Sequence, residues 1–296
     1  MILENYLTGF KRYALLEKEM NIKMVKEVIS SVKRLDKFTK ASLLTALNTE
    51  TIRNYLYTQK ELRIWAPRTF RNQRLYLKIF FNYCVTHQYL KKNPIDAIAR
   101  PKLPQTLPRF LTSKQVNKLL VELEFCDWRY ELERYRNKTI IYTFLFTGMR
   151  LNELVNLQIS DVNMIDREII VRKGKGKKQR MIPIHSNLFS ILEQYFKYIR
   201  GRKERSIWLF HNILNTSQIK CRSVQLLCEK LSKKVGFRYS PHWLRHTFGR
   251  NCTNAEISAF KIKELMGHSD IGTTQIYQSV AKKSLKDTFC NATLLG

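Results

Sequence analysis

Apolar residues recur at helical spacing through the N-terminal third of the chain. They lie three and four positions apart, as expected for one buried face of an α-helix. The segments with this pattern are residues 6–14, 22–32, 41–57 (as one or two helices) and 67–89. Pro67 suits the first turn of the last helix, because an N–H group there would have no helical partner. The pattern predicts a small all-α domain.

A second set of helices is predicted after residue 110. Thr112 is a suitable N-cap for a helix that runs to Leu123. Residues 137–147 form an apolar helix, and Gly148 suits the left-handed position that commonly follows a helix. Leu151 begins the next helix.

The repeat then changes from helical to alternating. Residues 168–171 and 179–184 flank the turn Lys173-Gly-Lys-Gly-Lys177. This arrangement predicts a β-hairpin. The predicted fold class is therefore mainly α, with a small β-sheet in the C-terminal part.

Prolines separate the two patterns, because they are spaced so that neither a helix nor a strand can continue through them. They are Pro94, Pro101, Pro104 and Pro108. We expect residues 100–109 to form an extended linker between a domain of residues 1–99 and a domain of residues 110–296.

Charge indicates the class of partner. The 296 residues include 53 Lys and Arg against 24 Asp and Glu, a net charge of +29. Residues 1–108 hold 20 of these basic and 8 of these acidic residues, so both parts of the chain are basic. Nucleic acid is the expected partner, since neutralised phosphates release counterions. A ribosome-like or anionic-membrane surface is the alternative, disfavoured because no separate amphipathic basic helix is present.

Secreted and membrane-spanning classes are disfavoured. The longest apolar stretch, residues 139–149, has about half the length of a membrane-spanning helix. No basic segment precedes an apolar core at the start, so we expect no secretory signal. The six cysteines lie far apart and form no CxxC pair. Since this is typical of reduced thiols, we expect a cytoplasmic protein without membrane contact.

The last predicted helix of the N-terminal domain carries a row of basic residues. Arg71, Arg74 and Lys78 share one face, and Arg68 precedes them. No acidic residue interrupts residues 63–95, which favours DNA contact, although a solvated charged face would look the same. Weaker candidates near a predicted helix start in the C-terminal domain are Lys220, Arg222 and Gln225.

Three motifs carry candidate chemistry. The first is Thr147-Gly-Met-Arg-Leu-Asn-Glu-Leu154, in which Arg150 stands at the mouth of a predicted helix. A guanidinium beside free backbone N–H groups suits a phosphate oxyanion. Taken alone, an arginine at a helix start is usually an ordinary surface residue.

The second motif is Pro241-His-Trp-Leu-Arg-His-Thr-Phe248. His242 and Arg245 share one helical face, and both can donate to phosphate oxygens. His242 and His246 have the spacing of zinc ligands, but Trp243 stands where the metalloprotease pattern needs Glu. We expect no metal here, and a structural role for His246.

The third motif is Leu265-Met-Gly-His-Ser-Asp-Ile-Gly-Thr-Thr-Gln-Ile-Tyr277. Gly267 ends a predicted helix, His268 follows in the turn, and Tyr277 comes nine residues later. Taken alone, Tyr277 would be an ordinary half-buried tyrosine.

In this order and spacing, the motifs and the hairpin lysines resemble those of the tyrosine recombinase (phage integrase) family, most closely its bacterial Xer-type members. The resemblance spans nearly the whole chain. It implies a helical core-binding domain of the SAM-like type, a proline-rich linker and a mixed α+β catalytic domain. Since helices begin almost at Met1, no additional arm-binding domain is expected.

The resemblance also implies a role for each motif residue. Arg150 and Arg245 would hold the non-bridging oxygens of the scissile phosphate, with Glu153 in a supporting role. His242 and His268 would help to stabilise the transition state, and His242 would accept the proton of the nucleophile.

Tyr277 would attack the phosphate and carry a covalent 3′-phosphotyrosyl intermediate. Lys175, at the hairpin tip, would protonate the departing 5′-hydroxyl, with Lys173, Lys177 and Lys178 as alternatives. The covalent intermediate stores the bond energy, and the sequence has neither a P-loop nor clustered carboxylates for two metal ions. We therefore expect no cofactor.

The implied function is strand exchange between two specific sites on double-stranded DNA, in dimer resolution for chromosome segregation or in integration or excision. It would require a homo- or hetero-tetramer. Apolar residues that could contact a neighbouring protomer are Leu285, Phe289, Leu294 and Leu295. A topoisomerase-like relaxing enzyme and a catalytically silent DNA-binding protein are the alternatives.

Overall fold

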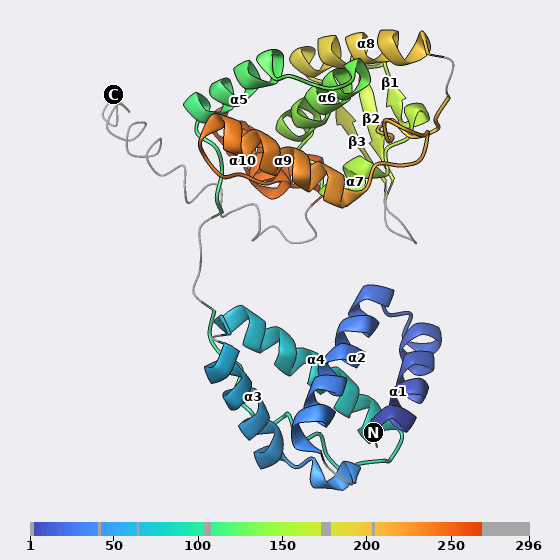
Figure 1. The fold of residues 1–296 in the computed structure, drawn as a ribbon, viewed down its shortest axis with the longest axis vertical. Helices are drawn as coiled ribbons and strands as arrows, with labels where there is room; N and C mark the ends of the chain where they lie inside the picture. Colours follow the sequence, from blue (N-terminus) through green and yellow to red (C-terminus); the bar gives the residue numbers. More distant parts are fainter. Residues whose placement is uncertain are drawn as a thin grey trace, which may run out of the picture. The chain divides into compact units, whose positions relative to one another are not determined.

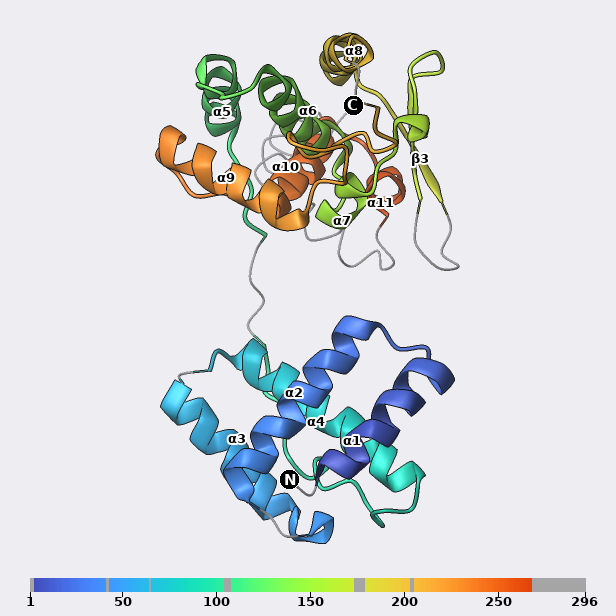
Figure 2. The same ribbon diagram turned by 45° about the vertical axis from the view of Figure 1, so that its right-hand side comes forward.

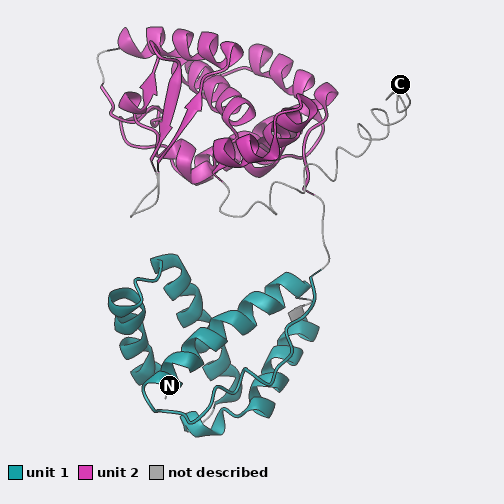
Figure 3. Cartoon of the chain, turned by 180° about the vertical axis from the view of Figure 1, so that it is seen from behind, with its two compact units in different colours: residues 1–105 teal, residues 106–296 magenta. Residues whose placement is uncertain are grey.

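The computed structural model describes residues 3–40, 43–63, 65–103, 108–172, 179–202 and 205–267. The chain divides into two compact units, an N-terminal unit of residues 1–105 and a C-terminal unit of residues 106–296 (Figure 3). The boundary between them falls inside the segment predicted as a linker.

The N-terminal unit is a group of helices with one apolar core (Figure 1). Helix α2 packs against α1, α3 and α4. The largest fully buried side chains of this core include Phe10, Leu35, Tyr55, Phe80 and Phe81. Its elements are α1 (Leu3–Arg12), the π-helical turn η1 (Tyr13–Glu17), α2 (Ile22–Thr39), the 3-10 turn η2 (Leu44–Ala46), α3 (Thr49–Arg63) and α4 (Pro67–Thr86).

The predicted helices of this unit are present, but several ends differ: residues 41–57 contain a 3-10 turn before α3, which continues to Arg63, and α4 ends at Thr86 instead of residue 89. The first helix changes to a π-helical turn at Tyr13. The sequence did not predict this change, because the short apolar pattern does not distinguish the two types of helix. The second helix continues to Thr39, beyond its apolar repeat, and ends at Lys40 with a φ of 47°. Asn21 begins it by accepting the N–H of Lys23 at 2.8 Å. As predicted, Pro67 stands in the first turn of α4.

Helix α6 (Glu131–Thr147) is the central element of the C-terminal unit, and it packs against α8 (Ser186–Arg200) and α10 (Pro241–Asn254) (Figure 1). Its buried threonines bond to carbonyls one turn earlier, as in the bond of 2.7 Å from Thr143 to Thr139. The other helical elements are α5 (Ser113–Phe125), α7 (Leu151–Val155), the 3-10 turn η3 (Ile159–Asp161), α9 (Cys221–Val235) and α11 (Ala259–Met266).

A three-stranded antiparallel sheet completes this unit, in the order β1 (Val162–Asn163), β2 (Glu168–Val171) and β3 (Arg180–Pro183). The predicted antiparallel pairing of the two hairpin strands is confirmed, and Val171 pairs with Arg180. Strand β1 was not predicted, because two residues are too few to show alternation. The turn lysines, including Lys175, lie outside the described residues.

Within the described part of the chain, every helix is too short or too polar to cross a membrane.

Candidate active site

Arg150 occupies the N-cap of α7, as predicted, directly after the turn at Gly148. Gly148 has a φ of 58°, and a side chain there would collide with the ring of Phe248. The main-chain N–H of Arg150 donates to Glu153 Oε2 at 2.8 Å, and its Nη1 donates to Oε1 at 2.9 Å. The side chain of Arg150 is 39% exposed, so a ligand can reach it.

Arg245 lies in α10 and is only 5% exposed. Burying a charge is costly unless hydrogen bonds compensate. Its Nη1 donates to the carbonyl of Gly148, and its Nη2 donates to that of Met266 at 2.9 Å. These two bonds hold the guanidinium between the turn at Gly148 and the end of α11.

The last residue of the predicted linker and a residue just after it contact α10. The N–H of Leu111 donates to Thr247 Oγ1 at 2.9 Å. The guanidinium of Arg109 lies over the ring of Trp243, 5.6 Å from its centroid. These contacts are one turn or less from Arg245, so they support its position.

The C-terminal end of α11 is where the arginines converge. The last carbonyls of a helix have no partner within it and form the negative end of its dipole. Here three consecutive carbonyls each accept a hydrogen bond from an arginine of a different element, while α11 lies beside β3 (Figure 2). The bonds are Arg180 Nε to Leu265 O at 2.8 Å, Arg245 Nη2 to Met266 O at 2.9 Å and Arg150 Nη2 to Gly267 O at 2.7 Å.

Glu153 joins two of these arginines. Its two carboxylate oxygens accept from Arg180 at 3.0 and 2.8 Å, in addition to the bonds from Arg150. Burial raises the pKa of Glu153, but the bonds and charges of Arg180 and Arg150 outweigh burial and lower it to about 2. Glu153 therefore pairs with Arg150 and Arg180 at once, while Arg245 donates to main-chain carbonyls nearby.

The histidines of α10 differ in their surroundings. His242 is exposed at the start of the helix. Burial, together with the charges of His242 and Arg245, lowers the pKa of His246 to about 4, so its imidazole is neutral at pH 7. Among the described residues, His, Cys, Asp and Glu form no group of three that could hold a metal ion.

Comparisons with known proteins show the family of the chain. Residues 109–284 match the model of the phage integrase family. The tyrosine recombinase XerA of Pyrococcus horikoshii is 35% identical over 213 residues, which are 70% of this chain and 70% of that protein. The chain belongs to the phage integrase family. It is a site-specific tyrosine recombinase.

Other similarities extend over almost the whole recombinase. The tyrosine recombinase XerC of Bacillus licheniformis is 29% identical over 299 residues, 97% of this chain and 95% of that protein. The fold is similar to that of XerH recombinase bound to a difH substrate after cleavage, with a TM-score of 0.76 and 20% identity over 96% of this chain and 84% of that one. A lambda integrase dimer bound to a core site gives a TM-score of 0.72 and 16% identity over 91% and 96% of the two chains.

The structure brings some of the predicted site residues of the recombinase together. Arg150, Glu153 and Arg245 lie around the end of α11, and His242 lies one turn before Arg245. The predicted residues Lys175, His268 and Tyr277 lie outside the described residues.

Arg180 was missed by the sequence analysis, although a signal for it was present. Because side chains alternate along a strand, Arg180 shares a face with Ile182. Ile182 is buried, and the side chain of Arg180 is only 7% exposed. An arginine on the inward face of a strand needs buried partners, so the alternation could have indicated its role.

The basic row on α4 of the recombinase has partners within its own unit. Arg74 donates from Nε to the carbonyl of Ile98 at 2.7 Å and from Nη2 to that of Ile95 at 3.2 Å. Lys78 forms an ion pair with Asp96 at 2.5 Å. Arg68 is exposed and Arg71 is partly exposed, so DNA contact by this face stays a prediction.

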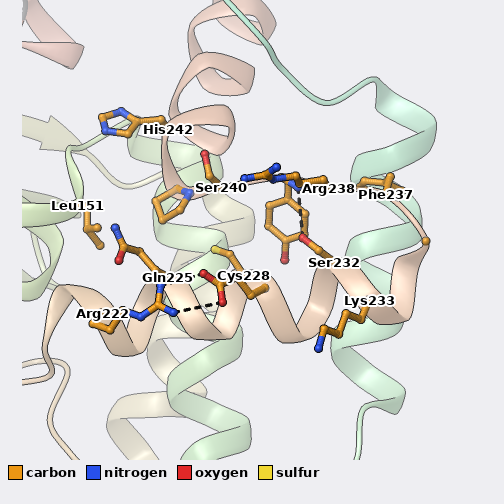
Figure 4. A pocket seen from close by; sticks show the side chains of 14 residues that line it. Leu151, Arg222, Gln225, Cys228, Ser232, Lys233, Phe237, Arg238, Ser240 and His242 are labelled. Carbon is orange, nitrogen blue, oxygen red and sulfur yellow. Dashed lines mark hydrogen bonds and ion pairs between the residues drawn. The ribbon is translucent and has the colours of Figure 1, made fainter. Parts of the chain in front are cut away.

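A cavity of about 780 Å³ lies between α9 and the start of α10, with His242 at its edge (Figure 4). The predicted residue Arg222 lines it and pairs with Glu229 at 2.9 Å. Lys233 and Arg238, which the sequence analysis did not single out, also line it. The predicted residue Lys220 is the exposed N-cap of α9.

Proposed function

We propose that the recombinase cleaves and rejoins double-stranded DNA through a covalent 3′-phosphotyrosyl intermediate on Tyr277, exchanging strands between two specific sites. The main support is the convergence of Arg150 and Arg245 on the end of α11. The residues matched by the family model, 109–284, also contain every proposed catalytic residue.

Arg150 and Arg245 are proposed to bind the scissile phosphate. A phosphodiester gains negative charge on its non-bridging oxygens in the transition state, so fixed cations stabilise that state more than the ground state. Hydrogen bonds to Glu153 and Gly267 fix the guanidinium of Arg150 before substrate arrives. The side chain of Arg150 is 39% exposed, so a phosphate can reach its guanidinium.

Proton transfer is assigned to Lys175 and His242. Tyr277 attacks phosphorus, its phenolic proton passes to His242, and the bond to the 5′-oxygen breaks. Lys175 donates a proton to that oxygen. This assignment is supported by the strand register, since the segment that carries Lys175 connects the paired residues Val171 and Arg180. His268 follows Gly267 directly in the sequence, which supports its role beside Arg150.

The remaining parts of the proposal concern binding and assembly. Residues 1–99 and the cavity beside His242 contact the DNA. Four protomers act on two sites, in a homo- or hetero-tetramer. The reaction takes place in the cytoplasm and resolves chromosome dimers during chromosome segregation, or integrates or excises an element.

A covalent-capture experiment tests the proposal. The recombinase is mixed with nicked duplexes of randomised sequence around the nick, and adducts are separated on denaturing gels and sequenced. Wild type should form an adduct and Tyr277→Phe none. Tyr198→Phe should keep the adduct, because its ring still stacks on Tyr135.

Two results would contradict the proposal. One is a wild-type protein that never becomes bonded to DNA, and the other is an adduct that survives in Tyr277→Phe. Relaxation of any supercoiled plasmid, without exchange between captured sites, would instead indicate a topoisomerase-like enzyme.

A further inference from the structure

Arg180 lies outside the three motifs, yet all of its side-chain nitrogens are engaged at the site. Nη1 and Nη2 donate to the two oxygens of Glu153, and Nε donates to the carbonyl of Leu265. Its side chain is 7% exposed, so its partners are protein groups rather than solvent. A buried guanidinium with this many partners fixes those partners relative to one another.

The bonds of Arg180 close a ring that includes Arg150. Glu153 accepts from both arginines. Gly267, whose carbonyl accepts from Arg150, lies two residues after Leu265, whose carbonyl accepts from Arg180. Arg150 is therefore held on one side by Glu153 and on the other by α11, and Arg180 connects these two supports.

The shape of the site fits a guanidinium at this point. Gly267 has a φ of 66°, and a Cβ atom there would lie 2.9 Å from Arg180 Nη1. The main chain thus approaches Arg180 as closely as a glycine permits. A lysine would present one compact ammonium group and could not match both carboxylate oxygens and the carbonyl in the same plane.

We propose that Arg180 is a positioning residue for strand cleavage, which holds Glu153 and the end of α11 together and thereby orients Arg150 toward the scissile phosphate. This inference rests on the proposed function. It also gives α11 a role, since the chain passes from the held carbonyl of Gly267 directly to His268 and then to Tyr277.

The test measures rate and amplitude separately, in single-turnover cleavage of a nicked duplex captured by the wild-type recombinase. The variants are Arg180→Met and Arg180→Lys. Arg167→Met is the matched control, because Arg167 lies in the turn between β1 and β2 and contacts the ring of Phe189.

A positioning defect should lower the rate and preserve the amplitude. For Arg180→Met we expect a rate about 100-fold lower at saturating protein, the size expected for a misplaced catalytic group. Arg180→Lys should not restore the rate, and Arg167→Met should match wild type. A purely structural defect would lower the amplitude, since fewer molecules would be folded, and leave the rate of the folded molecules unchanged; that result overturns the inference.

A double-mutant cycle tests the route through Glu153. In a Glu153→Gln background, Arg180→Met should lower the cleavage rate by less than about threefold, because the effects of groups that act as a unit are not additive. Losses that multiply would overturn the inference, as would Arg180 variants that cleave at the control rate. If Arg180→Met does not fold, Arg180→Lys replaces it in the cycle.

Absence of any wild-type adduct would contradict the proposed function itself, whereas a wild-type adduct with unaffected Arg180 variants contradicts only this inference.

Discussion

Arg245 in α10 and Arg74 in α4 form the same kind of hydrogen bonds but lie in different surroundings. Each donates from two nitrogens to carbonyls of a distant segment: Arg245 to Gly148 and Met266, and Arg74 to Ile98 and Ile95. Hydrogen bonding to main-chain carbonyls therefore does not by itself indicate a catalytic role.

The neighbours of the two arginines make the difference. One turn from Arg74, Lys78 is paired one-to-one with Asp96, and both side chains are substantially exposed. Near Arg245, two further arginines share the carboxylate of Glu153, and all three bind the end of α11. Exposed, paired charges contribute mainly to salt-dependent affinity, whereas fixed charges that converge on one point can stabilise a transition state.

The first prediction tests the two arginines themselves. Arg245→Lys should lower the rate of single-turnover cleavage by about 10²–10³-fold, because one preorganised donor to the transition state is lost. Arg74→Lys should instead lower the melting temperature of the protein, since its bonds connect α4 to residues 95–98. Rates at saturating protein and thermal melts of both variants provide the measurement.

The comparison would fail if the two variants exchanged their phenotypes. A slow but fully folded Arg74→Lys protein would mean that the chemistry depends on the N-terminal unit. A fast but less stable Arg245→Lys protein would mean that Arg245 only supports the fold.

The contrast also shows what could be predicted from sequence. Helix α4, the hairpin and Thr112 as a cap followed from local spacing, because each depends on neighbouring residues. The position of Arg150 followed in the same way, since Gly148 and Glu153 lie within one turn of it.

Contacts between distant segments could not be predicted in this way. Arg180 and Leu265 are 85 residues apart, and the bond between them depends on the packing of β3 against α11. Helical spacing placed Arg74 and Lys78 on one face, but it could not show that residues 95–98 cover part of that face.

A second prediction concerns Glu153 and the stability of the folded protein at low pH. The pKa of Glu153 falls from 4.5 to about 2 on folding. A lowered pKa stabilises the folded state above pH 4.5, and this contribution of about 3 kcal/mol is lost as pH falls toward 2. Glu153→Gln cannot titrate, so its free energy of unfolding should be lower at pH 7 and should fall less between pH 5 and 2. Urea unfolding of both proteins, followed by tryptophan fluorescence, measures this difference; parallel pH curves would contradict it.

The last prediction concerns the exposed charges on α4. If this face contacts DNA, Arg68→Gln should reduce the magnitude of the slope of log affinity against log salt by about 0.9. Lys78→Gln should reduce it less, because Asp96 already neutralises Lys78. In an Asp96→Asn background, Lys78→Gln should reach the same reduction of about 0.9, since Asp96 no longer neutralises Lys78.

Binding titrations over a range of salt concentrations give the slopes. Equal reductions for Arg68→Gln and Lys78→Gln in the otherwise unchanged protein would mean that DNA displaces Asp96, and unchanged slopes would mean that α4 does not face the DNA.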